Sequence, residues 1–344
     1  MSQRVAVLAG GRSSEHEVSL MSALGVAAAL RERGYEVTSI TIDREGAWSA
    51  GGAPVALVPG AGGRAVLASL DGGPDRAVDV VFPVLHGPFG EDGTVQGLCE
   101  MARVPYVGAG VAASAIAMDK ALFKVHCAEA GIPTPEWVGV DADAWAGGPA
   151  AVRARVADEV GYPAFVKPAR LGSSVGISKV TGPDGLDAAL ELAFAHDPKA
   201  LVERAIRGRE VEVGVLGGRG LTVSPPGEID YDADWYDYET KYQPGRARLI
   251  VPAELPGPVA ERARELAGRA FMAVGCWGMA RVDFFVEEAS DTVLVSELNT
   301  IPGFTPTSAY TSLMAAGGVP YGELVDRLVA LAAERAADAE RYRA

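Results

Sequence analysis

Two short β-rich runs near the C-terminal end of the chain carry polar residues at a spacing that could do chemistry. Separated by a polar turn, they hold, in order, Arg281, Asp283, Glu297 and Asn299. Side chains alternate along a strand, so a hairpin of the two runs would gather each pair on one face. Two carboxylates and an amide oxygen form a hard oxygen ligand set that suits Mg²⁺. A surface cluster of salt bridges is the alternative that the spacing alone leaves open.

A glycine-rich and serine-rich turn follows another β-rich run within residues 165–180. Glycines such as Gly176 let backbone N–H groups approach a phosphate closely. The hydroxyls of Ser173 and Ser174 add donors, and Lys167 supplies a positive charge. The turn is not a Walker A loop, because no Gly-Lys-Ser/Thr opens a helix there. The pattern predicts a phosphate-binding hairpin, and a plain β-hairpin with a glycine turn is the alternative.

Two segments near the N-terminus follow predicted strands, at the edge where α/β sheets place ligands. The first contains Glu15 and Glu17, which would oppose a phosphate and favour a cation such as a substrate ammonium. Simple helix capping by Ser13 or Ser14 would explain the same residues. The second is the run HGPFGEDG, opened by His86, which is either a ligand contact or a satisfied structural group.

An acidic and aromatic segment lies between two Pro-Gly pairs, within residues 226–245. Its single lysine, Lys241, stands among Asp and Glu residues and is followed by Tyr242. The segment has no clean period, so we expect a long loop, a type that is often functional. An acidic, solvated loop with its aromatic rings packed down on the body is the alternative.

The elements that must position these residues change in character along the chain. Alternating strand and helix patterns predict a parallel, helix-covered sheet over about the first 115 residues. From Asp119 onward, short β-rich runs punctuated by Pro and Gly suggest antiparallel sheets joined by turns. Helical patterns predict helices over residues 119–130, 185–195, 258–274 and 320–336.

Composition sets outer limits on the function. The chain has 344 residues, 49% of them hydrophobic, and a net charge of −14, which predicts about two or three packed domains. Because clustered Lys and Arg are lacking, a general nucleic-acid or anionic-membrane binder is disfavoured. Three scattered cysteines suggest neither a disulfide framework nor a zinc site, and point to a reducing cytoplasm. We see no signal peptide and no membrane span.

Taken together, these segments resemble the D-alanine:D-alanine ligases of the ATP-grasp superfamily. The run HGPFGEDG and the pattern from Arg281 to Gly303 are the most specific parts of a resemblance that extends from Glu15 to Ser308. It implies an α/β fold, with α+β character in the ATP-grasp part. The expected domains are an N-terminal parallel-sheet, Rossmann-like domain (1–118), a central lid (119–206) and a C-terminal part (207–344) with a mobile loop at 230–248.

The resemblance also implies a reaction and its nucleotide site. ATP phosphorylates the carboxylate of one D-alanine, and the amine of a second attacks the acyl phosphate to give D-alanyl-D-alanine for cell-wall synthesis. The residues expected to contact ATP are Lys120, Lys167, Ser174, Gly176, Glu203 at the adenine amino group, Arg204 and Ile206 through their backbones, Glu210 at the ribose, and Lys241. Asp283, Glu297 and Asn299 are expected to hold two Mg²⁺ ions, with Mn²⁺ as a substitute.

The remaining roles implied by the resemblance concern the amino-acid substrates. Glu15 would hold the first ammonium with His86 close by, Arg281 and the backbone of Gly303 would stabilise the oxyanion, and Ser308 would anchor the second carboxylate. Glu15, Ser173 and Tyr242 would fasten the closed loop. A homodimer, and a monovalent cation such as K⁺, are further family features. D-Lactate or D-serine as second substrate, or a silent nucleotide-binding relative, are the alternatives. The intact Tyr242 favours peptide formation, because the members that use D-lactate lack it.

Overall fold

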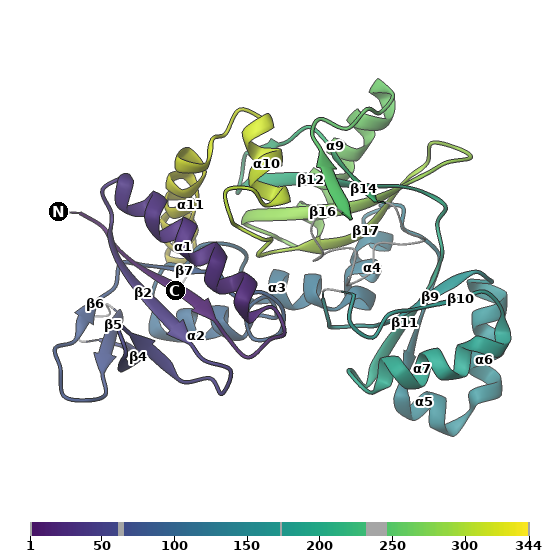
Figure 1. Cartoon of the computed structure of the whole chain (residues 1–344), viewed down its shortest axis with the longest axis horizontal. Helices are drawn as coiled ribbons and strands as arrows, with labels where there is room; N and C mark the ends of the chain where they lie inside the picture. Colours follow the sequence, from purple (N-terminus) through teal and green to yellow (C-terminus); the bar gives the residue numbers. More distant parts are fainter. Residues whose placement is uncertain (1, 61–64, 173, 232–245, 343–344) are drawn as a thin grey trace.

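The computed structural model describes residues 2–60, 65–172, 174–231 and 246–342, and it contains three β-sheets. Figure 1 shows the sheet of the N-terminal region at one end of the molecule and the two later sheets side by side at the other. The α/β class expected from the sequence is confirmed.

The N-terminal sheet has a parallel centre and an antiparallel extension. Its strand order is β6-β5-β4-β3-β2-β1-β7, and only the pairs β1·β2 and β1·β7 are parallel. Residues 48–77 therefore add antiparallel strands that the sequence analysis did not include. Their connections are too short for a helical crossover, and Gly51 and Gly52, both at positive φ, form the two-residue turn between β3 and β4. The strands are β1 (Arg4–Gly10), β2 (Glu36–Ile42), β3 (Trp48–Ala50), β4 (Ala53–Pro59), β5 (Ala65–Ser69), β6 (Arg76–Ala77) and β7 (Val80–Pro83).

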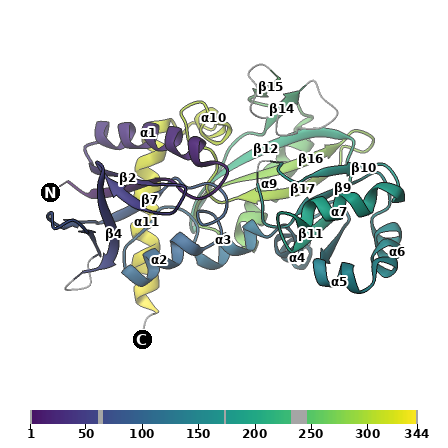
Figure 2. The same cartoon turned by 60° about the horizontal axis from the view of Figure 1, so that its bottom comes forward.

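Helices from both ends of the chain cover this sheet (Figure 2). Val5 and Val7 of β1 pack against α1 (His16–Glu32) and the C-terminal helix α11 (Tyr321–Arg341). Ala6 and Leu8 point to the opposite face, toward α2 (Thr94–Ala102). Both faces of β1 are buried, as a continuous apolar run predicts. Because α11 completes the N-terminal core, the first and last segments of the chain share one hydrophobic core.

The second sheet is antiparallel and, with its helices, spans residues 137–204. We call this part the lid after the sequence prediction, and its movement as a lid stays a prediction. The strand order of the sheet is β10-β9-β11-β8. The glycine-rich turn lies between the antiparallel strands β9 and β10, so the hairpin is confirmed. Its phosphate-binding role stays a prediction. The elements are β8 (Trp137–Asp141), α5 (Ala142–Gly147), α6 (Pro149–Glu159), β9 (Ala164–Pro168), β10 (Ser178–Val180), the short 3₁₀ helix η2 (Pro183–Gly185), α7 (Leu186–Phe194) and β11 (Lys199–Arg204).

The third sheet carries the predicted C-terminal hairpin as β16 and β17. Its order is β15-β14-β12-β16-β17, with β13 paired to β12. Helices α3, α4 and α9 bury one face around Phe123, Leu266 and Val282. The strands are β12 (Gly208–Gly217), β13 (Leu221–Val223), β14 (Gly227–Tyr231), β15 (Ala247–Ile250), β16 (Gly278–Glu287) and β17 (Val293–Asn299). The helices are α3 (Val111–Met118), α4 (Lys120–Glu129), α9 (Gly257–Ala273) and α10 (Ala309–Ala316).

The helices predicted at 119–130, 185–195, 258–274 and 320–336 correspond to α4, α7, α9 and α11. All three cysteines are free and buried, and burial raises the pKa of each thiol to about 12. Within the described residues, we find no helix with the length and apolar character needed to cross a membrane.

Candidate active site

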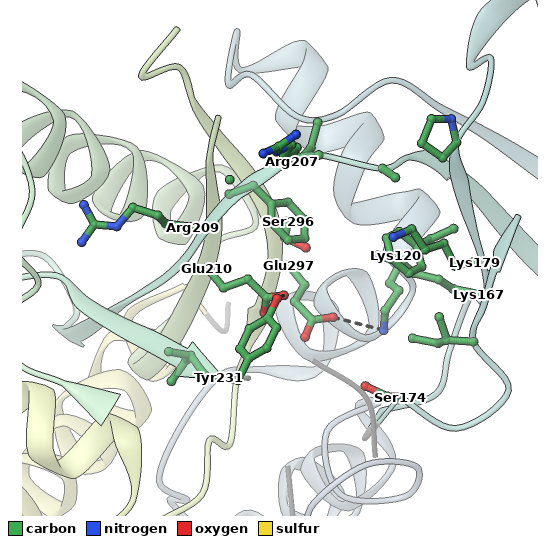
Figure 3. Close-up of a pocket in the computed structure, with 18 of the residues that line it drawn as sticks. Lys120, Lys167, Ser174, Lys179, Arg207, Arg209, Glu210, Tyr231, Ser296 and Glu297 are labelled. Carbon is green, nitrogen blue, oxygen red and sulfur yellow. Dashed lines mark hydrogen bonds and ion pairs between the residues drawn. The ribbon is translucent and has the colours of Figure 1, made fainter. Parts of the chain in front are cut away.

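Two adjoining cavities lie where the sheets meet. The larger, about 660 Å³, opens between the lid and the third sheet, and Figure 3 shows lysines and carboxylates converging on it. The smaller, about 310 Å³, is lined by residues of the N-terminal region, the lid and the C-terminal part. Five residues line both cavities: Lys120, Leu171, Gly172, Ile229 and Glu297. The two cavities therefore share a wall.

The β16–β17 hairpin brings the predicted metal ligands together. Asp283 lies opposite Glu297 and Arg281 lies opposite Asn299, with a register shift just after Asp283. Arg281 donates to both oxygens of Asp283 at 2.7 Å, and the Asn299 amide donates to the same carboxylate at 3.0 Å. Glu212 of β12 lies 3.2 Å from Arg281. Burial alone would lower the pKa of Arg281, but Asp283 and Glu212 raise it well above its ordinary value.

The donor chemistry of this hairpin fits a hard divalent cation. Asp283, Glu297 and Asn299 offer carboxylate and amide oxygens from paired positions on neighbouring strands. In the described part of the chain, no three His, Cys, Asp or Glu side chains are grouped so that they could hold a metal. A metal at the hairpin would therefore need the Asn299 oxygen and oxygens from outside the protein, which is typical of Mg²⁺ with a phosphate substrate.

Lys120 lies on the wall between the two cavities because of a local helix cap. It is the first residue of α4, and the carboxylate of Asp119 accepts from the backbone N–H groups of Ala121 and Leu122 at 3.0 Å each. The Lys120 ammonium donates to the carbonyl of Leu171 at 2.9 Å and lies 3.3 Å from Glu297, as the dashed line in Figure 3 marks.

Lys167 and Glu203 form a buried ion-pair cluster behind the larger cavity. The Lys167 ammonium lies 2.5 Å from Glu203, whose other oxygen pairs with the fully buried Lys124. Burial alone would raise the pKa of Glu203, but the two lysines outweigh it and lower the pKa. Lys167 lines the cavity, whereas the Glu203 carboxylate, expected at the adenine amino group, does not. Its adenine role stays a prediction.

The glycine-rich turn closes one side of the larger cavity through Gly172 and Ser174. Ser174 has a left-handed backbone, with φ +57°, and Gly176 has φ +72°. A Cβ atom at Gly176 would come within 2.7 Å of the His196 ring, so this turn needs glycine there. Gly176 itself is not on the cavity wall. Ser173 lies outside the described residues.

The opposite wall of the larger cavity carries the predicted ribose acid. Glu210 of β12 accepts a hydrogen bond from the Tyr231 hydroxyl at 2.7 Å, and the two side chains point toward each other in Figure 3. Ile206 lines the cavity beside them. Arg204 directs its side chain away from the cavity, to Glu287 at 3.0 Å and to Glu136.

Glu15, His86, Gly303 and Ser308 all line the smaller cavity, together with Arg281. The Glu15 carboxylate lies so close to Gly87 and Gly172 that a Cβ on either would approach it within 3.1 or 3.3 Å. The Nδ1 atom of His86 lies 2.9 Å from the carbonyl of Ile301, and burial lowers the pKa of its ring. Ser308 lies against Gly303, since a Cβ there would stand 3.3 Å from its hydroxyl.

Sequence reasoning gave no role to several charged residues on the cavity walls, such as Lys179, Glu91 and Glu212. Lys179 lines the larger cavity, and Glu91 and Glu212 line the smaller one. Lys179 is one of only six lysines and lies on the return strand of the glycine hairpin, which is a signal that could have found it. The predicted residues Lys241 and Tyr242, like most of the loop at 230–248, lie outside the described residues.

This arrangement defines a class of protein. Two sheets that enclose a cavity lined by lysines and by a carboxylate hairpin, with a second cavity adjoining it, form an ATP-grasp ligase fold. Family models described as the N-terminus and the C-terminus of D-ala D-ala ligase match residues 4–109 and 127–330.

Similar chains agree with these matches. A D-alanine–D-alanine ligase of Deinococcus radiodurans is 50% identical over 97% of this chain and 99% of its own length. One from Chlorobium luteolum is 45% identical, over 97% and 98%. Among solved structures, the D-alanine–D-alanine ligase of Coxiella burnetii matches with TM-score 0.87 and 34% identity, over 99% and 96%. VanG D-Ala:D-Ser ligase of Enterococcus faecalis matches with TM-score 0.85 and 35% identity, over 96% and 100%. The chain belongs to the D-alanine–D-alanine ligase family.

Proposed function

We propose that this chain joins two D-alanine molecules into D-alanyl-D-alanine at the expense of ATP, as a step of cell-wall precursor synthesis. The observation that carries the proposal is the pair of adjoining cavities that share Lys120 and Glu297. The larger has the size of a nucleotide site and the smaller that of a site for small amino acids. Their common wall is where a γ-phosphate would meet a carboxylate.

The nucleotide side of the proposal rests on charge. Lys120, Lys167 and Glu210 line the larger cavity. The two lysines would pair with the phosphates, and Glu210 would accept from a ribose hydroxyl. Asp283, Glu297 and Asn299 would hold Mg²⁺, which on binding neutralises phosphate charge during in-line transfer. In this step a carboxylate oxygen of the first D-alanine attacks the γ-phosphorus, and the bond from that phosphorus to ADP breaks.

The substrate side rests on the smaller cavity. Glu15, Arg281 and Gly303 line it. Glu15 would hold an ammonium, and Arg281 and the backbone N–H of Gly303 would stabilise an oxyanion. The amine of the second D-alanine, having lost a proton, attacks the acyl carbon, and the carbon–oxygen bond to phosphate then breaks. Ser308 would bind the second carboxylate. Removing one oxyanion donor of this kind typically lowers kcat about 10²- to 10³-fold.

The deciding experiment measures phosphate release from ATP in the presence of Mg²⁺ with D-alanine, compared with L-alanine. Release with D-alanine alone, and a product with the mass of the dipeptide, is the expected result. Absence of release with D-alanine alone would refute the proposal. Parallel reactions with D-alanine plus D-lactate or D-serine test the second substrate, and an excess of the mixed product would favour the alternative acceptor. The cytoplasmic location, the homodimer and the monovalent cation stay predictions.

A further inference from the structure

The run HGPFGEDG contains an acid, Glu91, to which the proposed reaction gives no role. Its side chain lies on the wall of the smaller cavity, between the 86–93 loop and the 301–303 loop. One carboxylate oxygen accepts from the backbone N–H of Gly87 at 2.8 Å, and the other accepts from the N–H of Ile301 at 2.9 Å. Glu91 therefore joins a loop of the N-terminal region to a loop that follows β17.

The Ile301 peptide is held from both sides. Its N–H donates to Glu91, and its carbonyl lies 2.9 Å from the Nδ1 atom of His86. A carbonyl can only accept, so this contact requires a proton on Nδ1. With the ring neutral, the proton is on Nδ1 and Nε2 carries a lone pair. That buried Nε2 atom has no hydrogen-bond partner among the described residues, in a side chain that lines the cavity.

The other end of the short loop is anchored as well. The N–H of Phe304 lies 3.3 Å from the Ser22 hydroxyl, and its carbonyl accepts from the Tyr321 hydroxyl at 2.9 Å. Gly303 therefore lies between two fixed peptides, those of Ile301 and Phe304. The direction of its backbone N–H depends on both anchors, and Glu91 is part of the first.

A carboxylate is costly at this position, which argues that its two acceptor oxygens are needed. Burial, with a further contribution from Glu15, raises the pKa of Glu91 to about 7. A glutamine would avoid that charge but has one acceptor oxygen, and its amide would face one of the two N–H donors.

We propose that Glu91 is a positioning residue. Its carboxylate fixes the 301–303 loop, and through the Ile301 carbonyl it fixes the Nδ1–H tautomer of His86. The oxyanion donor in that loop, the N–H of Gly303, and the ammonium acceptor Glu15 then face one substrate. This inference rests on the proposed function and adds to it a residue that acts through its neighbours. The neighbouring Asp92 supplies a matched control. Its two oxygens accept from the N–H groups of Phe89 and Thr94, at 2.8 and 2.9 Å, within the same part of the chain and without contact to Ile301.

The experiment compares Glu91→Gln with Asp92→Asn, each of which removes one of two acceptor oxygens. For Glu91→Gln we expect kcat to fall about tenfold to a hundredfold, because an oxyanion donor is displaced and not removed. We expect the KM for ATP to stay within about twofold, because Glu91 does not line the larger cavity. Asp92→Asn should keep kcat within about twofold of wild type. Equal losses in both variants, or a raised KM for ATP at unchanged kcat, would overturn the proposal.

A second readout does not depend on turnover. The chain has four histidines, so ¹⁵N chemical shifts can report the tautomer of His86, assigned with a His86→Gln variant. We expect the Nδ1–H form in the wild type and in Asp92→Asn, and a shift toward a mixture in Glu91→Gln. An Nε2–H tautomer in the wild type would overturn the proposal. If Glu91→Gln does not fold, Glu91→Asp, which keeps both acceptors on a shorter stem, is expected to give an intermediate loss of kcat. Wild-type inactivity with D-alanine would refute the proposed function, and the histidine signal would still decide on Glu91.

Discussion

The buried cluster of Lys124, Lys167 and Glu203 behind the larger cavity allows a prediction of stability from the structure. Lys124 is 1% exposed and pairs with Glu203, which is also 1% exposed and has one other cationic partner, Lys167. Replacing Lys124 by methionine keeps most of the side-chain volume and removes the charge. Glu203 is then left buried with a single cation.

The expected cost follows from the behaviour of buried ion pairs. Removing one partner of such a pair typically costs about 3–5 kcal/mol, because the remaining charge is uncompensated. Lys167 stays within 2.5 Å of Glu203, so we expect Lys124→Met to lie at the low end, about 3 kcal/mol. The double variant with Glu203→Gln should recover part of this loss, about 1–2 kcal/mol, because the unpaired carboxylate is gone.

Urea unfolding followed by tryptophan fluorescence measures this directly, since Trp137 and Trp145 lie in the lid. The matched control is Arg153→Ala. This substitution breaks the ion pair with Asp187. Both side chains of that pair are exposed, so we expect a much smaller loss of stability than for Lys124→Met. A Lys124→Met variant as stable as Arg153→Ala would refute the reasoning.

The same cluster fixes the sign of a pH effect. The folded-state pKa of Glu203 is lowered, so its stabilisation is present above the unfolded-state pKa and is lost as the pH falls through the folded-state pKa. The difference in stability between wild type and Lys124→Met should therefore shrink in acid. A difference that grows in acid would contradict the assigned charges.

Three further predictions concern the cavity walls. Glu297→Gln should abolish phosphate release at ordinary Mg²⁺ concentration, and higher Mg²⁺ should restore part of it. Normal turnover of this variant at ordinary Mg²⁺ would exclude the hairpin as the metal site. The folded-state pKa of Glu91 is raised to about 7. The wild type should therefore lose stability as the pH rises from about 4.5 to 7, by about 3 kcal/mol. In thermal melts, Glu91→Gln should lack this dependence of stability on pH. Gly90→Ala should destabilise the protein, since the added Cβ would stand 2.3 Å from the carbonyl oxygen of Leu85. Gly97→Ala, in α2 with open space around it, should leave the stability unchanged or raise it. Differential scanning calorimetry measures both.

The parts of the site that sequence could predict are those set by local periodicity. Alternation in β16 and β17 was enough to gather Arg281 with Asp283, and Glu297 with Asn299, on the face opposite the buried Val282 and Leu298. It did not predict the register shift just after Asp283. The strand-to-helix turn at Glu15 was predictable from local periodicity as well. Local pattern also explains the error at residues 48–77, where short strands without helices between them give no alternating signal.

The contacts that sequence could not predict join distant elements. His86 and Ile301 are 215 positions apart, and Glu91 and Ile301 are 210 apart. Nothing in the local pattern distinguishes Lys124, which is buried on Glu203, from Lys120, which faces the cavities. The two lie one helical turn apart on α4, and their environments differ because the lid sheet packs against one of them and the cavities open beside the other.

The charges of the site also explain how an acidic chain can bind a polyanion. In this chain of net charge −14, the carboxylates of the hairpin are paired with cations. Glu297, on the walls of both cavities, pairs with Lys120, and Asp283, which lines neither cavity, pairs with Arg281. We expect a nucleotide phosphate that pairs with Lys120 to weaken the ion pair between Lys120 and Glu297, and a metal cation bound to Glu297 to offset that loss. A metal bound to Glu297 alone would weaken the same ion pair, while Lys120 keeps its hydrogen bond to the Leu171 carbonyl. We therefore expect each ligand to bind more favourably when the other is present, and by linkage this coupling is reciprocal. The acidic hairpin would then favour the metal–nucleotide complex over either component alone.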